Sequence, residues 1–324
     1  MKVYIVGKGA VGTYFGDLLT RAGVEVEYAP RALSDVRSFD ADVALVTTKA
    51  YDTDSAIETL RKALTYPQKC VFVTPQNGVG NEEKLAAAFG VDNVVAAALT
   101  TPVDRDRDGH AVARKEGGLA LSPMGTNAYN WLIATFAAAG MNVKVVDDWR
   151  ALKWSKLALN VVANASCAIL NVLPNRLVHF DRIFTLEIRM VREVRAVMNA
   201  MNVTPIDLPR YPVRALFAIA QLPAAVARGL LARRIAGARG TKPPSLLLDL
   251  RSAKTHTEAE MLNGAVAAAG RERGVPTPVN AVYARVLNDI AHTPPLWAKY
   301  REHPETLEGE VLAEMKRVKA LAKK

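Results

Sequence analysis

Three polar residues at four-residue steps, Lys156, Asn160 and Asn164, interrupt the otherwise almost wholly apolar segment WSKLALNVVANASCAIL (residues 154–170). Steps of four residues bring side chains to one face of an α-helix. We therefore expect an ammonium and two carboxamides in one polar stripe on a helix whose other residues favour burial. A buried polar group without a partner costs about 1–3 kcal/mol, so the stripe must meet either polar groups of the same protein or a ligand.

A second candidate site is the glycine-rich loop GKGAVG (residues 7–12), which follows an apolar run and opens a helical pattern. The glycines of a G-x-G-x-x-G loop allow a tight turn, close approach of a pyrophosphate and close helix–strand packing. The first N–H groups of the helix favour an anion. A glycine turn without a ligand is the alternative. The residues predicted to bind a dinucleotide here are Gly7, Gly9, Ala10, Val11 and Gly12.

The end of the second strand bears on which dinucleotide is bound. NAD-selective loops usually carry an Asp or Glu there, which bonds the ribose hydroxyls. Here the strand Val24–Tyr28 runs into Ala29-Pro30-Arg31. An arginine can hold a 2′-phosphate, although it can equally be a solvated loop residue. The sequence favours NADPH over NADH, with the caution that Glu27 would lie near the ribose if the strand ended two residues earlier.

These residues need a scaffold, and the first half of the chain alternates short apolar runs with helical patterns. This alternation predicts a parallel sheet covered on both faces. The segments Ala111–Lys115 and Leu119–Pro123 resemble a hairpin, and the connection 32–42 has room for one short helix at Leu33–Phe39. The predicted strands are Lys2–Val6, Val24–Tyr28, Asp42–Thr47, Cys70–Thr74, Val94–Leu99 and Val143–Val146, and the predicted helices are Val11–Ala22, Thr53–Leu64 and Glu82–Phe89.

Strand patterns stop near Trp149, and amphipathic helical patterns continue to the C-terminus. We therefore predict an α/β protein with a Rossmann-type dinucleotide-binding domain at 1–148 and an all-helical substrate and catalytic domain at 149–324. The apolar helical domain makes a homodimer plausible. The apolar stretch 213–236 receives no role.

The composition excludes several classes of protein. A net charge of +10 could attract nucleic acid, but the basic residues are dispersed and no aromatic residues interleave with the basic C-terminal end. The apolar segment Val213–Leu231 contains Arg214, Pro223 and Arg228, which argues against a membrane span. Two cysteines suit a reduced, cytoplasmic setting. The histidines lack ligand spacing, so we predict no metal site.

Further motifs follow the glycine loop. They are TKA at 48–50, QNGVG at 76–80, KLALNVVAN at 156–164 and TEAEMLNG at 257–264. With them the chain resembles the ketopantoate reductase (2-dehydropantoate 2-reductase) family over nearly its whole length. Each motif alone is unspecific, whereas their combination in this order is specific. The resemblance implies NADPH-dependent reduction of ketopantoate to (R)-pantoate in pantothenate (coenzyme A) biosynthesis. A paralogue acting on another branched 2-keto acid and a dinucleotide-binding sensor without turnover are the alternatives.

The resemblance also implies roles for the two candidate catalytic residues. Lys156 is implied to be the general acid, and partial burial would lower its pKa toward a useful range. Its charge would also stabilise the alkoxide that develops during hydride transfer. Glu258 is implied to orient the lysine or to bond the substrate hydroxyl, although its polar segment is equally compatible with a surface position.

Substrate and cofactor contacts follow from the same resemblance. Asn160 and Asn164 would bind the substrate carboxylate or hydroxyls, and Ser245 is implied as a substrate-binding serine or, alternatively, a helix N-cap. Asn77 would contact the nicotinamide ribose, unless it only forms an Asn-Gly turn. Lys49 would lie between cofactor and substrate, or else be a solvated loop lysine.

Two features depart from the family pattern. The family usually places another strand between Arg31 and the strand at Val43–Thr47, where this chain has only the short connection Ala32–Asp42. Glu258 lies nine positions after Asp249, one more than the family pattern. We therefore expect a reduced sheet edge beside the adenine half of the site and an altered loop before Glu258.

Overall fold

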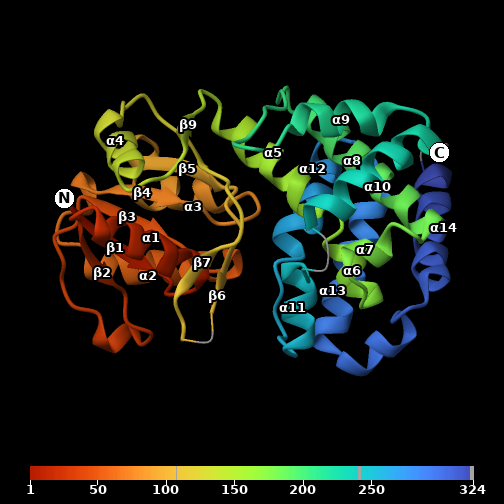
Figure 1. The fold of residues 1–324 in the computed structure, drawn as a ribbon, viewed down its shortest axis with the longest axis horizontal. Helices are drawn as coiled ribbons and strands as arrows, with labels where there is room; N and C mark the ends of the chain where they lie inside the picture. The colour runs from red at the N-terminus through yellow and green to blue at the C-terminus, as the bar shows by residue number, and fades with distance from the viewer. Residues whose placement is uncertain (107, 240–241, 322–324) are drawn as a thin grey trace. The chain divides into compact units, whose positions relative to one another are not determined.

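The computed structural model describes residues 1–106, 108–239 and 242–321. The chain forms two compact units, shown in Figure 1. The sheet unit comprises Met1–Lys156 and Ile206–Tyr211, and the helical unit comprises Leu157–Pro205 and Pro212–Lys324. The sequence placed the division at 148/149, whereas the units divide inside helix α5 (Trp149–Val161).

The core of the sheet unit is a seven-stranded sheet with the order β2-β1-β3-β4-β5-β8-β9 (Figure 1). Strands β1 to β5 are parallel, β8 runs antiparallel to β5, and β9 is parallel to β8. Strands β3, β4 and β5 are buried along their whole length, because a parallel sheet carries helices on both faces. The bounds are β1 Lys2–Val6, β2 Glu25–Tyr28, β3 Val43–Val46, β4 Val71–Thr74, β5 Val94–Leu99, β8 Leu119–Pro123 and β9 Val143–Val145.

Helices cover both faces of this sheet, as the alternating pattern predicted. Phe15 of α1 (Ala10–Arg21) and Phe136 of α4 (Asn130–Ala138) pack into the core of one face. Leu60 of α2 (Thr53–Ala63) and Leu85 of α3 (Asn81–Phe89) pack into the core of the other. The parallel part of the sheet therefore presents its carboxyl edge, with the loops after β1, β3 and β4, as the place where a ligand can bind.

Two local predictions were wrong. The segment β7 (Ala111–Ala113) pairs with β6 (Val103–Arg105) and not with β8, because the buried apolar residues of β8 insert beside β5 in the main sheet. The helix predicted at Leu33–Phe39 is only a 3-10 turn at Leu33–Asp35. It ends early because the N–H of Phe39 donates to the carbonyl of Ala63 at 2.7 Å, which keeps the chain extended. The connection 32–42 therefore contains no additional strand, as expected from its length.

The helical unit contains no named strand among its described residues, which confirms the predicted class of the second half. Its long helices α8 and α13 are buried at its centre (Figure 1). Within the described part of the chain, no helix is both long and apolar enough to cross a membrane. The bounds are α6 Ala165–Leu170, α7 Pro174–Leu177, α8 Asp181–Ala200, α9 Val213–Gln221, α10 Ala224–Arg239, α11 Ser245–Arg251, a π-helical turn Glu260–Gly264, α12 Ala265–Glu272, α13 Pro278–His292 and α14 Pro304–Leu321.

Candidate active site

The glycine loop between β1 and α1 has the shape that a pyrophosphate requires. A Cβ atom at Gly7, whose φ is +109°, would lie 2.6 Å from the backbone nitrogen of Thr48. A Cβ at Gly12 would lie 1.9 Å from the carbonyl oxygen of Gly7. Around Gly9, by contrast, no described atom apart from its chain neighbours comes within 4 Å of such a Cβ. Two glycines therefore permit close packing, and the third leaves open space in front of the first turn of α1, where N–H groups can receive an anion.

Side chains from two other segments hold the glycine loop in place. The hydroxyl of Thr47, at the end of β3, donates to the carbonyl of Gly7 at 2.7 Å. The guanidinium of Arg105, at the end of β6, donates to the carbonyl of Lys8 at 2.6 Å and to the hydroxyl of Thr13 at 2.9 Å. Sequence reasoning missed Arg105, because its segment carries no motif and its position beside α1 depends on the β6–β7 pairing.

Lys49 and Asn77 lie on neighbouring loops at the carboxyl edge of the sheet, and both are half-buried. The buried side chain of Gln76 ties these loops together. Its amide nitrogen donates to the carbonyl of Thr48 at 3.1 Å and to that of Lys49 at 3.3 Å. The structure thus brings Lys49 and Asn77 to the same edge as the glycine loop.

A buried ammonium joins α5 to this edge. The Nζ atom of Lys153 donates to the carbonyl oxygens of Gln76 at 2.6 Å and Ala97 at 3.3 Å. It also lies 2.8 Å from a carboxylate oxygen of Glu82 on α3, and the two side chains are 1% and 0% exposed. Burial raises the pKa of the Glu82 carboxyl, although the neighbouring ammonium acts in the opposite direction. Lys156, half-buried, lies one helical turn further along α5.

The predicted single helix through the polar stripe was wrong. Helix α5 ends at Val161, and Ala163 has a φ of +52°, so Asn164 starts a new helix instead of continuing the old one. The break is stabilised by Glu187 of α8, which accepts hydrogen bonds from the N–H of Ala163 at 2.7 Å and from the hydroxyl of Ser166. Only Lys156 and Asn160 remain one turn apart on a common helix.

Asn164 and Ser245 come together inside the helical unit. The carboxamide oxygen of Asn164 accepts the N–H of Leu246 at 3.2 Å, and its nitrogen lies 3.4 Å from the Ser245 hydroxyl. Asn164, which is 5% exposed, thus binds the first turn of α11. Ser245 is the first residue of that helix and Pro244 is its N-cap, so the N-cap reading of Ser245 was wrong.

Glu258 is 2% exposed, so the alternative of a surface position was wrong. Its carbonyl accepts the N–H of Leu262 at 3.0 Å, just where the chain enters the π-helical turn Glu260–Gly264. Such turns occur often at functional sites. Asn160, on the last turn of α5, is half-buried.

Arg31 is exposed and follows β2 closely. A neighbouring pocket of about 410 Å³ contains another arginine, Arg37, together with the carboxylates of Glu27 and Asp35. Arg37 was missed because the shortened connection offered no motif by which to place it. The pocket therefore presents both a cation that could read a phosphate and carboxylates that could bond ribose hydroxyls.

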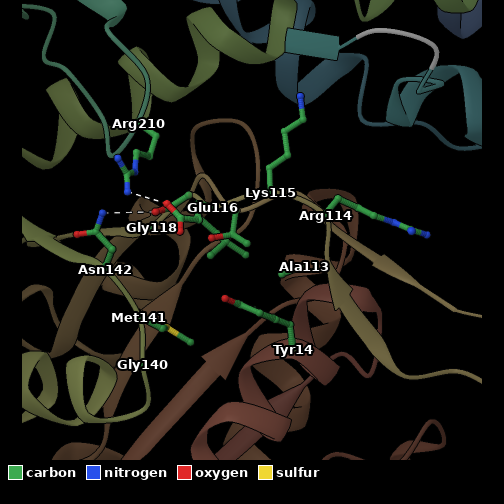
Figure 2. Close-up of a pocket in the computed structure, with 13 residues that line it drawn as sticks. Tyr14, Ala113, Arg114, Lys115, Glu116, Gly118, Gly140, Met141, Asn142 and Arg210 are labelled. Carbon is green, nitrogen blue, oxygen red and sulfur yellow. Dashed lines mark hydrogen bonds and ion pairs between the residues drawn. The ribbon is translucent and has the colours of Figure 1, made fainter. Parts of the chain in front are cut away.

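A larger pocket of about 770 Å³ lies elsewhere in the sheet unit (Figure 2). Among the described residues that line it, none belongs to the predicted site. Arg210 forms an ion pair with Glu116 at 2.7 Å, and the Arg114 and Lys115 side chains point in different directions, away from Tyr14. Its charges are therefore paired or dispersed, and the pocket does not assemble the chemistry described above.

The sheet order, the open glycine loop and the polar network at the carboxyl edge define the class of Rossmann-type dinucleotide-binding proteins. Residues 27–126 match the family described as Ketopantoate reductase PanE/ApbA, and residues 148–291 match Ketopantoate reductase PanE/ApbA C terminal. The 2-dehydropantoate 2-reductase of Pyrobaculum aerophilum is 30% identical over 294 residues, which span 85% of this chain and 93% of that protein. The chain therefore belongs to the ketopantoate reductase family, a family of oxidoreductases.

Solved structures show the same fold. The PanE/ApbA family ketopantoate reductase from Ralstonia eutropha JMP134 has a TM-score of 0.74 and 29% identity, over 90% of this chain and 98% of that one. A D-mandelate dehydrogenase in complex with NADH has a TM-score of 0.73 at 19% identity, over 90% of this chain and 99% of that one. At that identity the second likeness concerns the fold alone.

Proposed function

We propose that this protein reduces ketopantoate to (R)-pantoate with NADPH, as a step of pantothenate (coenzyme A) biosynthesis. The observation that carries the proposal is the position of Lys156. Its helix is fixed through Lys153 to the same edge of the sheet that holds the glycine loop, Lys49 and Asn77. The relatives named 2-dehydropantoate 2-reductase support the choice of substrate.

The chemistry requires a hydride, a proton and a grip on the substrate. The nicotinamide supplies the hydride when the cofactor is bound. Lys156 donates the proton to the oxygen of the reduced carbonyl, and its positive charge stabilises the negative charge that grows there. Glu258 is assigned as the second catalytic residue, which bonds the new hydroxyl or orients the lysine.

The carboxamides and the serine complete the proposed substrate site. Asn160 is assigned to the substrate because it lies one turn after Lys156 on α5. A carboxamide nitrogen has two N–H donors, so Asn164 can bond Ser245 with one and the substrate with the other. Ser245 then offers its hydroxyl from the first turn of α11.

The cofactor assignment has its own test. We assign the pyrophosphate to Gly7, Gly9, Ala10, Val11 and Gly12, and the nicotinamide half to Lys49 and Asn77. Arg31 is assigned to the 2′-phosphate, so Arg31→Ala should weaken NADPH binding far more than NADH binding. An equal loss for both cofactors would remove this role from Arg31, and a selective loss in Arg37→Ala instead would transfer it to Arg37.

Turnover is tested by following NADPH oxidation with a panel of 2-keto acids that includes ketopantoate. Lys156→Ala should lower kcat on the order of 10²–10⁴-fold because it removes the proton donor. Lys316→Ala, at an exposed position of α14, is the matched control and should retain activity. Turnover confined to other keto acids would identify a paralogue, and tight NADPH binding without any turnover would identify a sensor.

The homodimer and the cytoplasmic location remain predictions, which sedimentation and cell fractionation would test.

A further inference from the structure

We propose that Lys153 and Glu82 are a positioning pair, which sets the cofactor-binding loop around Asn77 and the proton-donor helix at Lys156 in register with each other. The inference rests on the proposed function, because that function assigns Asn77 to the cofactor and Lys156 to proton donation. Neither Lys153 nor Glu82 carries any of the roles assigned above.

The ammonium of Lys153 is used entirely inside the protein. Nζ donates hydrogen bonds to Gln76 O at 2.6 Å and to Ala97 O at 3.3 Å, and it forms an ion pair with Glu82 Oε1 at 2.8 Å. With 1% of its side chain exposed, Lys153 is not available to a substrate. Its function must therefore lie in what it holds.

What it holds is the peptide that leads into Asn77. The carbonyl of Gln76 belongs to the Gln76–Asn77 peptide, so its hydrogen bond to Lys153 fixes the plane of that peptide. On the other side, the carboxamide nitrogen of Asn81 donates to the carbonyl of Asn77 at 3.2 Å. Asn77 is thus held by a side chain on each side, and one of these side chains comes from α5.

The same ammonium fixes α5. Residues three apart are neighbours on one face of a helix, so the contacts of Lys153 set the rotation and height of the turn that carries Lys156. Two positions after Lys153, the hydroxyl of Ser155 accepts the N–H of Ile206 at 3.0 Å and restrains the helix further. A shift of the proton donor by about 1 Å can cost on the order of 10²-fold in rate.

Stability alone does not explain the pair. Buried ion pairs are often replaced by apolar residues without loss of stability, because desolvation offsets the attraction. Here both carboxylate oxygens of Glu82 are buried without a hydrogen-bond partner in the part of the chain that the structure describes, and Oε1 has only its ion pair with Lys153, which adds a further cost. The charge on Glu82 compensates an ammonium whose directed contacts connect α5 with the loop after β4 and with β5, which an apolar pair could not do.

The test compares the double variant Glu82→Leu/Lys153→Met, which leaves no unpaired buried charge, with the native enzyme. We expect kcat with the best 2-keto acid to fall on the order of 10²-fold, with KM for that acid changed only a few-fold. The single variant Lys153→Arg, which retains Glu82, should have a higher kcat than the double variant, since a guanidinium can still donate to the carbonyls. Lys84→Met, which breaks the exposed Lys84–Asp54 pair on the same helix α3, is the matched control and should leave kcat unchanged. A folded double variant with native kcat would overturn the proposal.

A binding measurement separates this inference from the proposed function. Asn77→Ala should weaken dinucleotide binding severalfold in the native protein but little in the double variant, because the loop is already misplaced there. Fluorescence titration with NADPH, and with NADH in parallel, measures this coupling even if no keto acid is turned over. Equal effects of Asn77→Ala in both backgrounds would overturn the positioning role, whatever the substrate proves to be.

Discussion

Both units bury carboxylates, but they neutralise them in different ways. In the sheet unit, Glu82 faces the ammonium of Lys153, which comes from a segment distant in sequence. In the helical unit, Glu187 and Glu193 face backbone N–H groups at a break and at a start of helices. Loops at the carboxyl edge of the sheet expose carbonyls that need a donor, whereas the N-terminal ends of helices expose N–H groups that need an acceptor. Glu82 therefore compensates an ammonium that such carbonyls require, whereas Glu187 and Glu193 meet the N–H groups directly.

Glu193 shows the helical solution most clearly. It accepts the N–H groups of Val279 and Asn280, both at 2.9 Å, and the Asn280 carboxamide at 2.7 Å. These groups lie in the first turn of α13, where a helix lacks internal acceptors and favours negative charge. Burial nevertheless raises the pKa of Glu193 to about 7. The three hydrogen bonds and the charge of Arg189 act in the opposite direction, toward the ionised form.

The largest expected effect concerns the buried Glu82–Lys153 ion pair of the sheet unit. Glu82→Leu alone leaves the Lys153 ammonium buried without an anion and should lower the free energy of unfolding by about 3–5 kcal/mol. The double variant Glu82→Leu/Lys153→Met should recover most of this loss, as urea unfolding would measure. Lys84→Met should cost at most about 1 kcal/mol, since its pair is exposed. Additive losses in the double variant would mean that the two charges do not compensate each other.

A second prediction concerns how stability depends on pH through Glu193, the buried carboxyl that accepts backbone N–H groups. The unfolded chain releases the Glu193 proton near pH 4.5, whereas the folded protein keeps it up to about pH 7. Ionisation therefore favours the unfolded state in this window, and the free energy of unfolding should fall by on the order of 3 kcal/mol as pH rises through it. Glu193→Gln should lack this fall, whereas Glu58→Gln, at an exposed position of α2, should keep it. The same pH profile for all three proteins would show that Glu193 is ionised when folded.

The smallest expected effect on stability concerns the residue at the break between α5 and α6. Ala163 holds a left-handed φ of +52°, which costs about 1–2 kcal/mol for a residue with a Cβ. Ala163→Gly should therefore stabilise the protein by about 0.5–1 kcal/mol after its own entropy cost. Ala158→Gly, in the interior of α5, should destabilise the protein by about as much. Thermal unfolding of both variants and the native protein would measure these differences. If Ala163→Gly were as destabilising as Ala158→Gly, the break would not be a strained position.

The sequence was most informative where local pattern decides structure. The strands β1, β3, β4 and β5 lay where continuous apolar runs placed them, and the glycine loop fell between β1 and α1 as its spacing required. The polar stripe was only half right. Its periodicity continued through Asn164, but the periodicity of a helix does not reveal that a distant carboxylate, Glu187, will stabilise a break in it.

By itself, then, the sequence determined the two-part architecture, the glycine loop and the place of Lys156 and Asn160 on one helix, because each depends on neighbours within a few positions along the chain. Tertiary structure alone decided that Lys153 would meet both Glu82 and the Gln76–Asn77 peptide, that Glu187 would interrupt the stripe, and that Arg105 would support the glycine loop. These contacts join residues tens of positions apart. Their partners are chosen by how strands pair and helices pack, and no local pattern of residue types carries that information.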